Sequence, residues 1–247
     1  MCQRKDLGDL PQFVFDSSKK NLPRCSIEDV LMDDAEIPNI EKYRISPKLE
    51  EMIRAWDDFV KGTNGDMFGH ICVDFLRDTR DDEAYYKLEP YMRHYYDKCM
   101  EFYKKHKTFI DQWKTTHLNV EMFKDESRRH IEWQTDRGEG QSIWNHLMQL
   151  RPSGLRVKRP TMFPTLVAIV QSPIIGKYRR YITPREAARL QSFPDSFQMH
   201  SDDHTAYKQF GNSVNVAVVC EMVKFLFGDP ETRARYGINN ISSIFVD

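Results

Sequence analysis

The chain has 247 residues, 40% of them hydrophobic, and a net charge of −1, so it can bury a core without help from disulfides or metals. It has no apolar run of about 18 residues, and no apolar stretch follows its basic N-terminus, so neither a membrane span nor a secretory signal is expected. The five cysteines are widely spaced and form no CxxC pair, which argues against a disulfide framework or a zinc site. We therefore expect a globular protein in the cytoplasm.

Opposite charges are segregated along the chain. Residues 26–60 hold ten acidic residues and four Lys or Arg, whereas residues 151–190 hold nine Lys or Arg and the single acid Glu186. The second stretch could meet a polyanion such as nucleic acid. A basic face that only contacts solvent would have the same composition.

The first half of the chain predicts helices. In SPKLEEMIRAWDDFVK, residues 46–61, apolar residues recur at helical spacing between a Ser46 N-cap and Gly62. A long aromatic and basic segment, residues 82–113, is predicted to be helical with a break near Pro90. Its aromatic residues could stack on nucleic acid, but their spacing is more typical of a helix packed onto its own domain.

From residue 151 the sequence becomes basic and rich in Pro and Gly: RPSGLRVKRPTMFPTLVAIV. This pattern predicts an irregular surface loop, followed by an apolar β-strand that holds it rigid. Such a loop can place cationic side chains against phosphates or base edges. The candidate DNA-binding residues are Arg151, Arg156, Lys158 and Arg159.

The segment TPREAARLQSFPD, residues 183–195, carries dense helix signals. Thr183 is the expected N-cap, Pro184 occupies the first helical position, and Glu186 completes a capping box. Pro194 prevents the helix from continuing. A capping box is common, so by itself this segment predicts only a well-formed helix.

A second informative segment is AYKQFGNSVNVAVVCEMVKFLF, residues 206–227. Gly211, Asn212 and Ser213 are predicted to form a tight turn and a cap, and a helix that is apolar on nearly every side follows from Val214. Such a helix must be buried. Its start would present free amides and two polar side chains to a small ligand, although a satisfied cap without a ligand explains the same residues.

Taken together, TPREAARLQSFPD and YKQFGNSVNV closely resemble the ninth and tenth conserved blocks of DNA (cytosine-5) methyltransferases. SIEDVL near the start looks like the lead-in to the target-recognition region of bacterial members, and RPSGLRVKRPTMFPTLVAI looks like the end of that region. The resemblance is strong over residues 151–227 and weaker before them.

The resemblance implies a mechanism whose central parts this sequence lacks. In the family, a cysteine in a Pro-Cys pair attacks C6 of a flipped cytosine, a Glu-Asn-Val glutamate supports N3, and S-adenosylmethionine methylates C5. The 247 residues contain no Pro-Cys pair, no Glu-Asn-Val triplet and no FxGxG cofactor loop. Cys2 follows Met, Cys25 follows Arg, Cys72 follows Ile, Cys99 follows Lys and Cys220 follows Val, so none follows Pro. We therefore expect no catalytic residue and no metal ligand in this chain.

By resemblance, the chain corresponds to the C-terminal portion of such an enzyme and has an α+β fold. Residues 1–45 would enter from the catalytic domain, and residues 46–178 would form a target-recognition domain of short strands and helices. Residues 179–200 would hold the ninth-block helix that braces this domain. Residues 201–247 would hold the tenth-block helix, which docks on a partner's doubly wound α/β methyltransferase domain.

The resemblance also assigns roles to residues. Structural roles are expected for Thr183, Arg185, Glu186 and Gly211. The residues expected to approach S-adenosylmethionine, in a pocket shared with the partner chain, are Asn212, Ser213 and Val214.

The function predicted from these assignments is DNA recognition and completion of the cofactor site, in a restriction-modification methyltransferase whose catalytic cysteine lies on a separate subunit carrying the first eight blocks. Alone, the chain would be inactive. The sequence leaves open a natural split subunit or a truncated gene. A stand-alone sequence-specific DNA-binding or regulatory module, or an inactive remnant, is the alternative.

Overall fold

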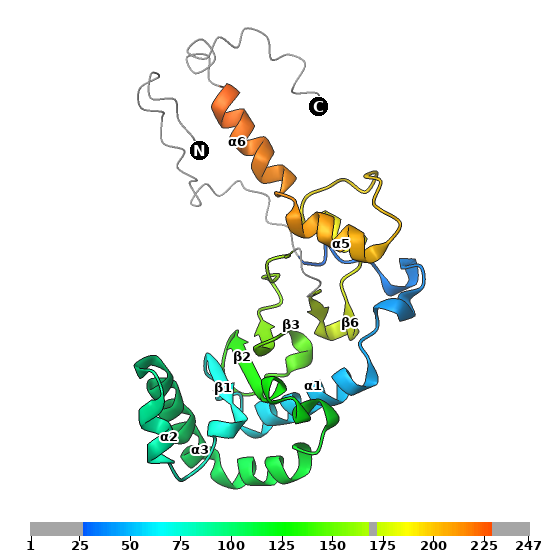
Figure 1. The fold of residues 1–247 in the computed structure, drawn as a ribbon. Helices are drawn as coiled ribbons and strands as arrows, with labels where there is room; N and C mark the ends of the chain where they lie inside the picture. The colour runs from blue at the N-terminus through cyan, green and yellow to red at the C-terminus, as the bar shows by residue number, and fades with distance from the viewer. Residues whose placement is uncertain (1–26, 168–171, 229–247) are drawn as a thin grey trace, which may run out of the picture.

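The computed structural model describes residues 27–167 and 172–228, which form an α+β fold, as the sequence predicted (Figure 1). The helices are α1 (Pro47–Gly62), α2 (Asp82–Lys87), α3 (Pro90–His117), α4 (Pro184–Leu190), α5 (Asp203–Asn212) and α6 (Val216–Gly228). The strands are β1 (His70–Cys72), β2 (His130–Gln134), β3 (Leu147–Arg151), β4 (Gly154–Lys158), β5 (Ile174–Ile175) and β6 (Arg180–Tyr181).

The six strands form one mixed sheet in the order β1-β2-β4-β3-β5-β6. Only β2 and β4 pair in parallel; the other neighbours are antiparallel. Gly154 opens β4 with φ +116°, and a Cβ there would lie 2.4 Å from the His130 carbonyl oxygen. A residue without a side chain is therefore required where β4 passes β2.

The larger hydrophobic core lies between one face of the sheet and helices α1 and α3. Ile131, Leu155 and Val157 point from the sheet into it, and Trp56 and Phe59 enter from α1. The Trp56 ring lies 5.6 Å from the Trp113 ring of α3, and Trp113 Nε1 donates a hydrogen bond to the Ala55 carbonyl. These contacts hold α1 and α3 against the sheet.

A smaller core joins the β3–β5 end of the sheet to α4 and α5. Leu147 and Ile175 face Ala187 of α4 and Phe210 of α5. In Figure 1, α6 extends from α5 away from the sheet, while α2 and α3 lie at the opposite end of the molecule. Helices α4 and α5 thus pack on the body through this smaller apolar cluster.

The structure confirms the predicted helix over residues 46–61, with the Ser46 side chain accepting a hydrogen bond from the Leu49 amide. It also confirms the predicted break near Pro90, which begins α3. Most aromatic residues of this segment are buried or half-buried, but Tyr86 and Tyr91 are exposed.

The expected loop from residue 151 is wrong. Arg151 ends β3 and Gly154 begins β4, so the Pro152–Ser153 dipeptide closes a tight β-hairpin instead. The apolar strand expected behind the loop does not form over residues 161–167, and the next four residues lie outside the described part of the chain. Apolar residues at alternate positions of β4, buried against β2 and β3, explain why this basic segment is a strand.

Candidate functional site

The ninth-block helix α4 begins with the predicted capping box. The Glu186 amide donates to Thr183 Oγ1 at 3.2 Å, and the Thr183 amide donates to Glu186 Oε2 at 2.6 Å. Both side chains are buried, with Glu186 fully inaccessible to solvent. The roles expected of Thr183 and Glu186 in organising this helix are therefore consistent with the geometry.

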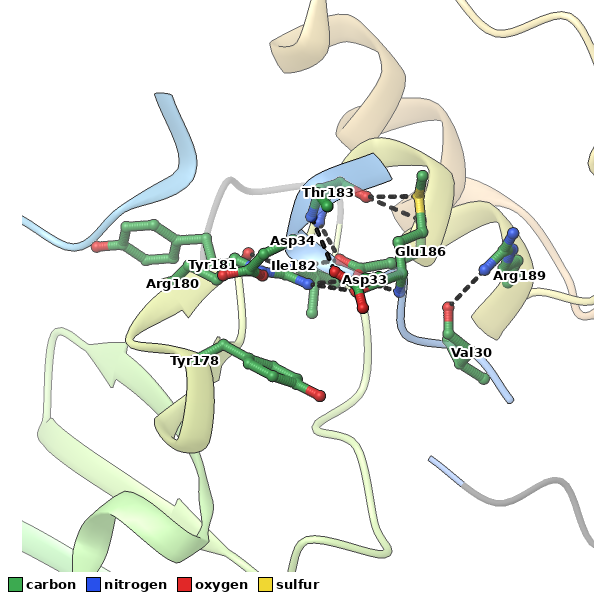
Figure 2. A network of polar contacts seen from close by, with 12 residues as sticks. Val30, Asp33, Asp34, Tyr178, Arg180, Tyr181, Ile182, Thr183, Glu186 and Arg189 are labelled. Atoms are coloured by element: carbon green, nitrogen blue, oxygen red, sulfur yellow. Dashed lines mark hydrogen bonds and ion pairs between the residues drawn. The ribbon is translucent and has the colours of Figure 1, made fainter. Parts of the chain in front are cut away.

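Glu186 does more than cap the helix, because it is the main partner of a fully buried arginine, Arg180 of β6 (Figure 2). The Arg180 Nη2 and Nη1 atoms donate to Glu186 Oε1 and Oε2 at 2.8 and 2.9 Å. Its Nε donates to Asp34 Oδ1 at 2.8 Å, and the remaining bonds go to the Tyr181 and Met32 carbonyls. All five N–H donors of the guanidinium have acceptors.

These contacts join segments that are far apart in sequence. The Met32 amide donates to Glu186 Oε1 at 2.9 Å, and Arg189 Nη1 donates to the Val30 carbonyl at 3.3 Å. Burial opposes the charge on Arg180, but its hydrogen bonds to Glu186 and Asp34 outweigh burial and raise its pKa above the ordinary arginine value. The segment before α1 is thus fastened to α4 through buried charges.

Arg185, the other residue expected to brace this region, is placed differently. Its Nη2 donates to the Phe197 carbonyl at 2.9 Å, and its Nη1 lies 3.5 Å from the Pro194 carbonyl oxygen. Arg185 therefore fastens the loop that follows α4.

The candidate DNA-binding residues mostly share one surface. In β4, Leu155 and Val157 face the core, so Arg156 and Lys158 point to the opposite face of the sheet. Arg151 of β3 points to that same face, because it pairs with Gly154, and Gly154 and Leu155 are on opposite faces of the sheet. Arg159 follows the strand and is exposed.

Acidic neighbours reduce the positive charge of this face. Arg156 forms a bidentate salt bridge with Glu132 of β2. Its Nε donates to Oε2 at 2.7 Å and its Nη2 donates to Oε1 at 3.1 Å. Arg151 Nη1 lies 3.7 Å from Glu132 Oε2, and Arg159 pairs with Asp136 at 3.0 Å. Among the described residues, Lys158 makes no ion pair.

The tenth-block turn differs from the sequence prediction. Gly211 and Asn212 form the last turn of α5 rather than a tight turn, Ser213 is the C-cap, and α6 begins at Val216 rather than Val214. The N-terminal cap of α6 is another residue, Asn215.

The reason for the shift is a set of hydrogen bonds to α4. Asn215 Oδ1 accepts from the Val218 amide at 3.2 Å, while Asn215 Nδ2 donates to the Leu190 carbonyl at 3.1 Å. The Val216 amide donates to the Gln191 carbonyl at 2.9 Å. The first amides of α6 are therefore largely satisfied within the chain, which removes the expected free amides.

The predicted cofactor-facing residues remain accessible in part. Asn212 and Val214 are exposed, and Val214 is 65% exposed. Ser213 is half-buried, and its hydroxyl donates to the Phe210 carbonyl at 2.8 Å.

Within this chain by itself, α6 is not buried at the residues whose side chains are described; its expected burial against a partner chain stays a prediction. Val218 and Val219 are 45% and 41% exposed, and no residue from Val216 to Lys224 is buried. The helix is strongly apolar, yet this chain places no apolar partner around it within the described residues. An exposed apolar helix of this kind marks an interaction surface.

Among the residues that the structure describes, no group of three or more His, Cys, Asp or Glu side chains could hold a metal ion. No helix among them is both long and apolar enough to cross a membrane.

The chain belongs to the C-5 cytosine-specific DNA methylase family, whose family model matches residues 18–227. It is 46% identical over 99 residues to the Type II methyltransferase M.AluI from Cellulosimicrobium cellulans, covering 40% of this chain and 19% of that protein. It is 65% identical over 48 residues to M.HgiCI from Herpetosiphon aurantiacus, covering 19% of this chain and 11% of that protein.

A third relative, M.BanI from Aneurinibacillus aneurinilyticus, is 50% identical over 66 residues, or 27% of this chain and 13% of that protein. The matched segments thus span less than a fifth of the length of each of these three relatives. No solved structure matches the chain.

Three important residues were not found from the sequence. Arg180 and Glu132 look like ordinary surface charges there, because their partners lie on other strands or far along the chain. The sequence could have indicated Asn215 as an N-cap, since Asn is favoured at that position. Its side chain accepts from the amide of Val218, three residues further on.

Proposed function

We propose that this chain supplies DNA recognition and one wall of the S-adenosylmethionine pocket to a C-5 cytosine DNA methyltransferase whose catalytic cysteine is on a separate chain. The assembled enzyme methylates C5 of a cytosine within a specific duplex sequence. In this proposal, DNA meets the sheet face that carries Arg151, Arg156 and Lys158, together with Arg159.

The observation that carries this proposal is the exposure of α6. The helix is mostly apolar apart from Glu221 and Lys224, extends away from the body in Figure 1, and has Val218 and Val219 open to solvent. Exposed apolar area of this kind favours burial against another protein surface. Within the described residues, α6 is attached to the body only at its start, through Asn215 and Val216, so most of the helix is free to dock.

The turn before α6 fits a cofactor that has both polar and apolar parts. Asn212 offers an exposed amide that makes no hydrogen bond within the described residues, and the neighbouring Val214 offers an exposed apolar side chain. When bound, S-adenosylmethionine supplies the methyl group. The residues of this chain would hold it and orient it at the junction with the catalytic chain.

The test uses the full chain, co-expressed with a catalytic chain that carries the first eight blocks. The wild-type chain alone should transfer no methyl groups to mixed-sequence DNA, because it lacks the nucleophile. The pair should co-purify and be active. Val218→Asp should abolish co-purification, since it places a charge in an apolar interface.

Lys224→Asp is the control, because it places the same aspartate side chain on α6 at a residue that is already exposed and charged; it changes the net charge by −2, whereas Val218→Asp changes it by −1. It should leave assembly intact. Asn212→Ala should also assemble but bind S-adenosylmethionine more weakly in calorimetry. Methyl transfer by the chain alone, or normal assembly of the Val218→Asp variant, would contradict the proposal.

A further inference from the structure

Two cations lie side by side on the polar face of the sheet, which we define as Glu132 and Gln134 of β2 with Arg156 and Lys158 of β4. Register places Glu132 opposite Arg156 and Gln134 opposite Lys158. Arg156 is paired with Glu132 through two hydrogen bonds, whereas Lys158 has no ion pair within the described residues. Arg156 and Lys158 therefore lie two residues apart on β4 but differ in whether an acidic partner already occupies their hydrogen-bond donors.

The pairing leaves a specific part of Arg156 free. An arginine side chain has five N–H donors, and Glu132 takes one from Nε and one from Nη2. Three donors have no acceptor in the part of the chain that the structure describes: two on Nη1 and one on Nη2. One from each of these nitrogens forms the fork at the tip of the guanidinium, which matches two neighbouring acceptors such as O6 and N7 of guanine.

Glu132 is itself held in place, so it can fix the direction of that fork. Gln134 Nε2 donates to Glu132 Oε1, and Arg151 Nη1 lies 3.7 Å from Glu132 Oε2. The side chains of Arg156 and Glu132 are 23% and 26% exposed, so each is mostly enclosed while part of it reaches solvent. A side chain that is oriented before binding loses less entropy when it binds.

The same pairing makes Arg156 a weak phosphate ligand, because Glu132 compensates its charge. Lys158 has no acidic partner among the described residues and, as a compact ammonium, suits a phosphate oxygen better than a base edge. The two cations therefore divide naturally into one that reads sequence and one that adds salt-dependent affinity.

We propose that Arg156 determines sequence specificity by donating two hydrogen bonds to a guanine edge of duplex DNA, that Glu132 is its positioning residue, and that Lys158 contacts a phosphate. This inference rests on the proposed DNA-recognition function. It adds a residue-level division between specificity and affinity on the sheet face.

The experiment selects duplexes from a pool with a randomised central segment, using the full chain and its variants, and then measures binding to the enriched sequence at several salt concentrations. The wild type should enrich a sequence with a fixed G·C pair. Arg156→Lys, which keeps the charge but loses the fork, should reduce discrimination at that pair by about 5- to 150-fold. Its salt dependence should stay close to that of the wild type.

Glu132→Gln keeps the shape of the side chain but removes the charge that orients Arg156. It should weaken preference at the same base pair and increase binding to random DNA. Lys158→Gln is the matched control: it should preserve the selected sequence and lower the salt slope by about one unit. Thermal melts of all variants should remain close to wild type, since these side chains are partly exposed.

The outcomes separate the inference from the function on which it rests. A wild-type chain that enriches no sequence would contradict the proposed recognition function itself. A wild-type chain that enriches a sequence which Arg156→Lys also selects unchanged would overturn only the role of Arg156. A change of preference in Glu132→Gln without one in Arg156→Lys would mean that Glu132 contacts the base directly, and would equally overturn the assignment.

Discussion

Two arginine–glutamate pairs in this molecule have the same chemistry and different environments. Arg180 and Glu186 are both fully buried, and every donor of Arg180 is used within the chain. Arg156 and Glu132 are partly exposed, and three donors of Arg156 have no acceptor among the described residues. The first pair has nothing left to offer a ligand, whereas the second does.

The comparison shows that the number of unused donors distinguishes a structural pair from one that can bind. A buried pair is held because water cannot replace a lost partner, so removing one member leaves an uncompensated charge. A partly exposed pair loses little when a partner is removed, because water solvates the remaining group.

The largest effect is expected for Glu186→Ala. The change leaves the Arg180 charge buried with Asp34 as its only ionic partner in the described chain, and it also removes the capping box. The free energy of unfolding should fall by about 3–5 kcal/mol, measured by urea denaturation. This is well above the roughly 1 kcal/mol that loss of a cap alone would cost.

Replacing both members, Arg180→Met with Glu186→Leu, should recover part of that loss, because no uncompensated charge remains. A loss of only about 1 kcal/mol in Glu186→Ala would show that Arg180 is compensated by other groups, and the contrast between the two pairs would then disappear.

An intermediate effect is expected at the start of α6. Asn215→Ala removes the N-cap of α6 and the hydrogen bond to the Leu190 carbonyl. The free energy that stabilises α6 should therefore fall by about 1 kcal/mol. Hydrogen exchange of the α6 amides measures this locally. The Asn215→Asp variant keeps the cap and is the control; equal protection in the wild type and both variants would rule out a capping role.

A smaller effect is expected for Arg156→Met. Its pair with Glu132 is partly exposed, so the free energy of unfolding should change by less than about 1 kcal/mol. The parallel variant Arg180→Met should lose several times more, because it leaves Glu186 buried. Similar losses in the two variants would mean that solvent exposure does not separate these pairs.

The smallest effect concerns pH. Burial lowers the pKa values of His70 and His130 below the ordinary 6.5, and for His70 the nearby His130 adds to the shift. Below that value the unfolded chain therefore binds more protons than the folded one. Stability should be full above about pH 7 and should decline as the pH falls through the lowered folded-state pKa values.

The measurement is the urea midpoint between about pH 7.5 and 5.5, a window in which ordinary carboxylates stay ionised. The His130→Gln variant should reduce the slope; an unchanged slope would assign the pH dependence to other groups, of which His146 is one, since burial lowers its pKa too.

Local signals in the sequence predicted several elements well. The Ser46 cap, the interruption at Pro90 and the capping box of Thr183 and Glu186 all depend on residues within one helical turn, and all are confirmed. The family membership, also confirmed, followed from the two ordered blocks near the C-terminus. The assignment of cofactor contacts to Asn212, Ser213 and Val214 stays a prediction.

The predictions were wrong where contacts with residues distant in sequence determine the local structure. The basic segment from residue 151 was expected to be a loop from its Pro and Gly content, but strands β2 and β3 pair with its central residues. The start of α6 was misplaced because the side chain of Asn215 and the Val216 amide bond to residues at the end of α4.

The sequence by itself determined the helix boundaries that local caps and prolines specify, the segregation of charge, and the two blocks that identify the family. Only the tertiary structure decided which charges are buried and which keep donors without an acceptor among the described residues. Arg180 meets Asp34, 146 residues away in sequence, and Arg156 meets Glu132 across a parallel strand pair. The reason is physical: the sequence gives the charge of a side chain but not its neighbours, and the neighbours decide whether its hydrogen-bond donors have acceptors within the chain.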